Sequence, residues 1–193
     1  MCAHLRLPFS PDPGDLPDPL PGDTSPSEER RDAHQDKRDR YHAFREVRHT
    51  ILRRIGDHYR IPEGDHRSWQ GCNLDLTGVT IDGNMDFTDA VFSGGSVDFT
   101  GARFSGGRVE FGSAVFSGGI VEFGTARFDG GIVGFSDATF SGGSLGFTGA
   151  VFSGGSMTFE VTAGPAPVGL LAPVGTPVPS EVRLRTDWLP PGS

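Results

Sequence analysis

The sequence predicts an all-β fold, a four-sided parallel β-helix (solenoid) that follows an N-terminal α-helix, and three observations support this prediction. Phenylalanine recurs in the second half of the chain with gaps that alternate five, seven, five, seven. A twelve-residue unit repeats with it, as in VDFTGARFSGGR and VEFGSAVFSGGI. A stripe of apolar residues at helical spacing precedes the repeat. Repeats at a short fixed period are typical of stacked units that bury one shared core.

Residues 1–24 are expected to be a disordered, proline-rich leader. Proline recurs six times between positions 8 and 21, with aspartate and glycine between, and no apolar periodicity is present. Proline removes backbone hydrogen-bond donors, and a segment with little to bury does not fold on its own. The first residues, MCAHLRLPF, lack the apolar stretch of a secretory signal peptide.

An amphipathic helix is predicted over residues 25–61. Ser25 can cap its N-terminus, Pro26 suits the first helical position, and Glu28 completes a capping box. Pro62 and Gly64 end it. The apolar residues at spacings of three and four are Tyr41, Phe44, Val47, Ile51, Leu52, Ile55 and Tyr59.

Residues 62–73 are predicted to connect this helix to the repeat and to help cap it. A solenoid end exposes core side chains, which must be covered. Trp69 is the one large apolar side chain in this connector. We therefore expect the helix stripe to dock over the first coil near Trp69, with a capping set made of Phe44, Val47, Ile51, Ile55 and Trp69.

The repeat, residues 74–161, is predicted to form the solenoid. In each five-residue piece a small or branched residue stands two before an aromatic, as Val97 stands before Phe99. Residues two apart on an extended chain point the same way, so both face inward. Gly-Gly pairs such as Gly106 and Gly107 suit corners that need a positive φ or close packing.

Each coil is expected to hold two units, or 24 residues. One unit per coil would force two phenylalanines into a slot too thin for their bulk, whereas two units give four sides and four phenylalanines. The outward positions of the A-x-F pieces agree, because Arg103 and Arg127 recur at 24 residues. This arrangement stacks the two arginines, at a small cost on a solvated surface. Phe99 should then lie one coil below Phe123.

Residues 162–193 form a proline-rich tail, which is a candidate C-terminal cap. Proline does not serve in an interior ladder. The short alternation that begins at Val182 could add a strand, and Trp188 could help to cover the end.

The pieces VDFTG, ARFSG, AVFSG and LDLTG resemble the motif of the pentapeptide-repeat proteins: a small residue, a variable polar residue, Leu or Phe, Ser or Thr, and Gly. The resemblance implies a right-handed, four-sided β-helix. The chain departs from the family by inserting Gly-X after every second pentapeptide, and its first unit is one residue short. The segments FREVRHTILRRIGDH, SWQG and DLTGVTIDG also resemble the stretch before the repeats in longer bacterial members with membrane segments upstream.

The repeat carries two outward acidic columns. With 24 residues per coil, Asp86 stacks on Glu110 on one side, and Asp98 stacks on Glu122 on the opposite side. These four acids, with Arg103 and Arg127, form the candidate interaction surface. Some members of the resembling family are thought to inhibit DNA gyrase by imitating DNA. A soluble outward position explains the columns more simply.

Composition bounds the function classes. The net charge is −8, with the acids concentrated in the repeat and ten basic against seven acidic side chains in residues 28–60. The two cysteines, Cys2 and Cys72, give neither a disulfide framework nor a zinc motif. The chain contains no run of about 18 apolar residues, the length that a membrane-spanning helix needs. These features favour a cytoplasmic location, with membrane association suggested by the resemblance alone.

No catalytic constellation, metal site or cofactor motif is recognisable, so we expect a protein that is not an enzyme and holds no cofactor. The function predicted is a non-catalytic protein-interaction or scaffolding module with an unknown protein partner. The alternative is a DNA-mimic regulator of an enzyme such as gyrase. Direct nucleic-acid binding is not expected, whereas the basic helix leaves peripheral membrane contact as an option. The oligomeric state stays open.

Overall fold

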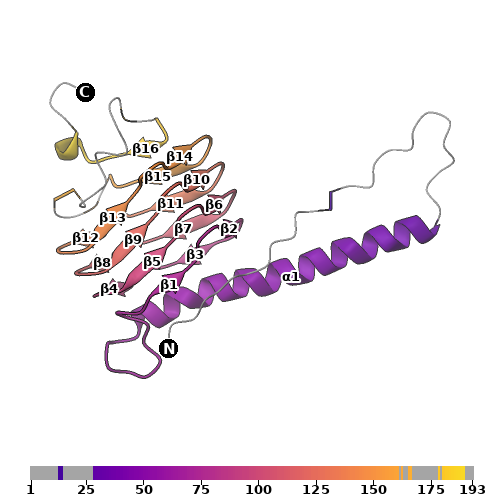
Figure 1. Cartoon of the computed structure of the whole chain (residues 1–193), viewed down its shortest axis with the longest axis horizontal. Helices are drawn as coiled ribbons and strands as arrows, with labels where there is room; N and C mark the ends of the chain where they lie inside the picture. The colour runs from indigo at the N-terminus through magenta and orange to yellow at the C-terminus, as the bar shows by residue number, and fades with distance from the viewer. Residues whose placement is uncertain are drawn as a thin grey trace.

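The computed structural model describes residues 13–14, 28–160, 162, 165–166, 178 and 180–189. Within them the chain forms a four-sided parallel β-solenoid of four sheets, with one long helix across its N-terminal end (Figure 1). This confirms the fold class that the sequence predicts. The leader predicted for residues 1–24 lies outside the described residues apart from 13–14, and so does most of the tail predicted for 162–193.

The helix α1 spans Glu28–Arg60, and the strands follow it in coils of four, one strand on each side. The first coil holds β1 (Leu74–Asp75), β2 (Thr80–Ile81), β3 (Met85–Asp86) and β4 (Val91–Phe92). The second holds β5 (Ser96–Asp98), β6 (Arg103–Phe104), β7 (Arg108–Glu110) and β8 (Val115–Phe116). The third holds β9 (Ile120–Glu122), β10 (Arg127–Phe128), β11 (Ile132–Gly134) and β12 (Thr139–Phe140). The fourth holds β13 (Ser144–Gly146), β14 (Val151–Phe152) and β15 (Ser156–Thr158).

Strands on one side pair in parallel from coil to coil. The four sheets are β1-β5-β9-β13, β2-β6-β10-β14, β3-β7-β11-β15-β16 and β4-β8-β12. The register confirms the 24-residue coil, because Val97 pairs with Val121. Between the first two coils Leu74 pairs with Val97, a step of 23, because the first repeat unit is one residue short.

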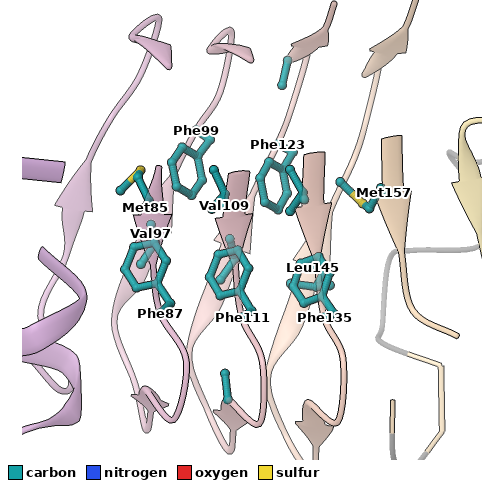
Figure 2. Close-up of a cluster of buried hydrophobic side chains, with 14 of the residues drawn as sticks. Met85, Phe87, Val97, Phe99, Val109, Phe111, Phe123, Phe135, Leu145 and Met157 are labelled. Carbon is teal, nitrogen blue, oxygen red and sulfur yellow. The ribbon is translucent and has the colours of Figure 1, made fainter. Parts of the chain in front are cut away.

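The interior is a set of phenylalanine ladders. The rings of Phe87, Phe111 and Phe135 stack with centroids 4.9 and 4.8 Å apart, and Phe99 stacks on Phe123 at 5.2 Å (Figure 2). Of the phenylalanines in the repeat, all are buried except Phe152 of the last coil, which is half-buried. The one-coil separation of the rings follows from the strand spacing of about 4.8 Å.

Glycine pairs form two of the four corners. At these corners three amide groups of one coil donate to one carbonyl of the coil below. The Phe92 carbonyl accepts hydrogen bonds from the N–H groups of Ser117, Gly118 and Gly119 at 3.1, 3.2 and 2.9 Å. A Cβ on Gly119 would lie 2.9 Å from the Cβ of Phe92. The pair therefore permits the close approach of two coils, as the sequence predicts.

The C-terminal end of the solenoid is capped by residues 180–189. The strand β16 (Val182–Arg183) pairs in parallel with β15, and the 3₁₀ helix η1 (Thr186–Trp188) follows it. Trp188 is buried, and its ring lies 6.0 Å from that of Phe159. The expected added strand and the role of Trp188 are thus confirmed.

Candidate functional site: the docked and projecting faces of α1

The C-terminal half of α1 is anchored on the first coil. Leu52, Ile55 and Tyr59 are fully buried. The Tyr59 ring lies 5.0 Å from Phe92, tilted, and 6.0 Å from Phe87, edge-on, so it covers the ends of two ladders. The helix backbone also comes very close to β3, because a Cβ on Gly56 would overlap the Asp86 carbonyl oxygen.

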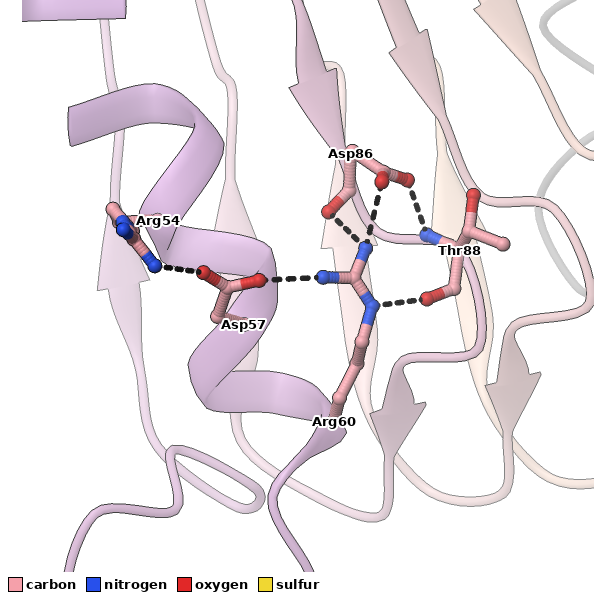
Figure 3. Close-up of polar contacts among 5 residues, drawn as sticks. All are labelled: Arg54, Asp57, Arg60, Asp86 and Thr88. Atoms are coloured by element: carbon pink, nitrogen blue, oxygen red, sulfur yellow. Dashed lines mark hydrogen bonds and ion pairs between the residues drawn. The ribbon is translucent and has the colours of Figure 1, made fainter. Parts of the chain in front are cut away.

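Arg60 ties the end of α1 to the corner after β3 (Figure 3). Its Nη2 donates to the Asp86 carbonyl at 2.8 Å and lies 3.0 Å from the Asp86 carboxylate. Its Nε donates to the Thr88 carbonyl, and its Nη1 donates to Asp57 at 2.8 Å. Asp57 also accepts from Arg54. One guanidinium therefore donates hydrogen bonds to two backbone carbonyls that face the helix, those of Asp86 and Thr88.

A second polar cluster surrounds Asp82, at the corner between β2 and β3. Arg45 Nε donates to its carboxylate at 3.1 Å, His49 Nε2 lies 3.3 Å away, and Arg48 Nη1 lies 4.0 Å away. Burial raises the pKa of Asp82, but the hydrogen bonds from Arg45 and His49 and the charge of Arg48 outweigh it, so the net pKa is lowered. Burial likewise lowers the pKa of Arg48, which is 6% exposed. The anchoring face is thus polar as well as apolar.

The predicted capping set is correct for three residues and wrong for two. Ile55 is buried, and Ile51 and Trp69 pack partly buried against the core. Trp69 stacks on His58 at 4.3 Å and meets the Tyr59 ring edge-on at 6.4 Å. Phe44 and Val47 do not dock, because they are 61% and 59% exposed. Arg45, Arg48 and His49 take the docking side of the helix in their place.

Both acidic columns form as the sequence predicts, but their acids already make structural contacts. Asp86 pairs with Glu110, and Asp98 pairs with Glu122, at neighbouring ladder positions. Asp86 and Asp98 accept hydrogen bonds from the amides of Thr88 and Thr100 at 2.9 and 2.8 Å, which closes the turn after each strand.

The two glutamates differ in their surroundings. Glu110 lies 2.8 Å from Arg108, and burial together with the charge of Asp98 raises the pKa of Glu122. Each glutamate also lies over a glycine of the next coil, because a Cβ on Gly134 or Gly146 would overlap its carboxylate. The columns are therefore short and partly neutralised.

The stacked arginines are bridged. Arg103 pairs with Arg127 in the ladder, as predicted, and Asp129 lies 2.6 Å from Arg103 Nε and 3.8 Å from Arg127 Nε. Ser153 also donates to Asp129 at 2.7 Å. The hydrogen bonds from Ser153 and Arg103 lower the pKa of Asp129, and they outweigh the opposite effect of burial. This corner carboxylate offsets the like-charge contact.

Among the described residues, no three His, Cys, Asp or Glu side chains gather as ligands for a metal ion. No helix described has the length and apolar character needed to cross a membrane. Comparison with protein-family models, curated proteins and solved structures gives no match. The candidate site is the exposed face of α1, where Phe44 and Val47 are accessible.

Proposed function

We propose that the chain is a non-catalytic protein-interaction or scaffolding module, in which the solenoid holds α1 in a fixed position and α1 presents a docking surface. The repeated motif supports placing the chain beside the pentapeptide-repeat proteins, which are built on such solenoids. A rigid solenoid suits display, because its core, corners and capped end fix its surface positions.

The observation that carries this proposal is the exposure of Phe44 and Val47. Both lie on a helix whose other face is anchored by Leu52, Ile55 and Tyr59. Large apolar side chains that gather on an exposed face commonly mark an interaction site. Phe44 and Val47 remain accessible although the same helix buries other apolar side chains on its docked face.

The DNA-mimic alternative has less support. Asp86 is held by Arg60, and Glu110 is held by Arg108. Duplex DNA carries one charge per about 1.7 Å of its axis over both strands. Acids that cap turns and pair with arginines do not provide that density, so we place interaction through α1 first.

A paired-variant capture experiment tests the proposal. The tagged full chain and a Phe44→Ser, Val47→Ser variant are used to capture proteins from a lysate of the source cells, with quantification by mass spectrometry. The matched control is Ile120→Ser, Val151→Ser, which removes two apolar side chains that are 41% and 44% exposed on the solenoid. We expect at least one protein to be lost with the α1 variant and kept with the control. Equal capture by all three chains would refute a role for this face.

A further inference from the structure

The exposed face of α1 carries an ordered seam of basic and apolar residues. Its members follow at steps of three, four, three, four and three: Lys37, Arg40, Phe44, Val47, Ile51 and Arg54. An alternation of three and four residues keeps side chains on one side of a helix and is the a/d spacing of coiled coils. Ile51 is half-buried, and the other members are exposed.

The seam lies to one side of the face that docks on the solenoid. With about 100° of rotation per residue, its centre lies roughly a quarter of a turn from the face that holds Leu52, Ile55 and Tyr59. The seam is about 26 Å long, at 1.5 Å per residue. Its members are exposed except Ile51, which packs partly against the core, so the accessible apolar contact comes from Phe44 and Val47. Figure 1 shows that the N-terminal part of α1 extends well beyond the coils, so a second element can lie along it.

The width of the seam favours a helical partner over a lipid surface. Phe44, Val47 and Ile51 lie within about 60° of rotation, and an apolar stripe that narrow suits a coiled-coil seam. An interfacial membrane helix needs a broad apolar face with basic residues around it. On α1 the acids Asp36 and Glu46 also lie on the exposed side.

The charge pattern disfavours pairing with a second copy. In an antiparallel pair centred on Val47, Arg40 of one copy would face Arg54 of the other. In a parallel pair Lys37, Arg40 and Arg54 would each face themselves. Like charges across a seam are a device against self-pairing, and they select a partner of opposite charge.

We propose that this basic-apolar seam binds an amphipathic helix whose own seam carries acidic residues on both sides of a short apolar stripe. The inference rests on the proposed function and names the class of partner. Phe44 and Val47 would supply the buried apolar contact. Lys37, Arg40 and Arg54 would set the register and exclude basic or neutral helices.

Binding to designed helical peptides tests the inference. The acidic probe is a labelled peptide of about 21 residues, long enough to hold a helix, with leucine opposite the three apolar positions and glutamate opposite the three basic ones. It is made in parallel and antiparallel order. The matched peptides carry lysine in place of the three glutamates. Fluorescence anisotropy is measured with the full chain at low and high salt.

We expect the acidic probe to bind in at least one order and the lysine peptide to bind at least tenfold more weakly. Phe44→Ser with Val47→Ser should weaken binding about a hundredfold, because two apolar side chains are no longer buried. Lys37→Glu with Arg40→Glu should weaken the acidic probe about tenfold and strengthen the lysine peptide. Ile120→Ser with Val151→Ser should leave both affinities unchanged. This exchange of preference cannot arise from misfolding.

Three results would overturn the inference. One is equal affinity for the acidic and lysine peptides, and a second is an unchanged preference in the Lys37→Glu, Arg40→Glu variant. The third is that neither peptide binds while the seam has another occupant. That occupant would be a second copy of the chain, seen as dimerisation in sedimentation, or a lipid surface, seen as binding to vesicles of phosphatidylglycerol and phosphatidylcholine. If the acidic probe does not bind but capture from the lysate still depends on Phe44 and Val47, the acidic-helix inference is refuted and the proposed function stands.

Discussion

Replacing Phe116 by alanine removes the centre of one aromatic ladder and should be among the most destabilising single changes in the chain. The Phe116 ring is fully buried and stacks on Phe92 at 4.8 Å and on Phe140 at 4.7 Å. It also touches Phe111 at 5.8 Å and Phe135 at 6.1 Å. Phe→Ala changes in a core cost about 3–5 kcal/mol.

We expect a value near the upper end of that range, about 4–5 kcal/mol, for two reasons. Each stacked aromatic pair adds about 0.5–1.5 kcal/mol beyond area burial, and two such pairs are lost. The backbone ladders on both sides also fix the coil spacing, so the cavity cannot collapse, and incomplete collapse raises the cost of a cavity.

The measurement is urea unfolding followed by circular dichroism, with Phe152→Ala as the matched control. Phe152 belongs to the same kind of strand position but is half-buried, and it stacks on Phe128 at 4.7 Å. It should cost only about 1–2 kcal/mol, because less apolar area leaves the core. The unfolding midpoint of Phe116→Ala should therefore fall well below that of the control. Equal midpoints for the two variants would refute the ladder as the source of stability.

Three other predictions concern the helix dock and the acidic surface. Gly56→Ala should destabilise the chain by about 1–3 kcal/mol, because the new Cβ overlaps the Asp86 carbonyl, whereas Thr50→Ala on the exposed side should be nearly neutral in thermal unfolding. Asp82→Asn should cost stability at neutral pH. Because the pKa of Asp82 is lowered in the folded state, that cost should shrink below about pH 4, the region of its unfolded value, as seen in unfolding curves at several pH values. The chain should not inhibit DNA supercoiling by gyrase at micromolar concentration, and inhibition that is lost in an Asp98→Lys variant would contradict our interpretation of the acidic columns.

The repeat could be predicted from the sequence because each of its constraints recurs. Thirteen phenylalanines at alternating gaps define the inward positions, and only a 24-residue coil places them in ladders. The glycine pairs could be assigned to corners for the same reason. The bridge between Arg103 and Arg127 was missed, although a signal was present: Asp129 stands where the other units carry serine.

The docking face of α1 could not be chosen from hydrophobic spacing, because apolar residues occur at steps of three and four on two faces. Phe44 and Val47 fit one face, and Leu52 and Tyr59 fit the other. The choice depends on polar residues that a hydrophobic pattern ignores. Arg48 and its neighbours meet Asp82, which is far away in the sequence, and only the folded corner brings the two groups together.

The two halves of every coil are nearly equivalent, and this gives the rod an approximate twofold screw axis. One twelve-residue unit turns the chain by half a revolution and advances it by half of the coil spacing of about 4.8 Å. An insertion of 24 residues would lengthen the rod and leave its two ends in the same orientation. An insertion of twelve would preserve the core and corners but carry the cap at Trp188 to the opposite side of the rod from its present position relative to α1. The angle between the two ends therefore changes in steps of half a turn. Chains that differ in their number of repeat units would alternate between two arrangements of helix and cap.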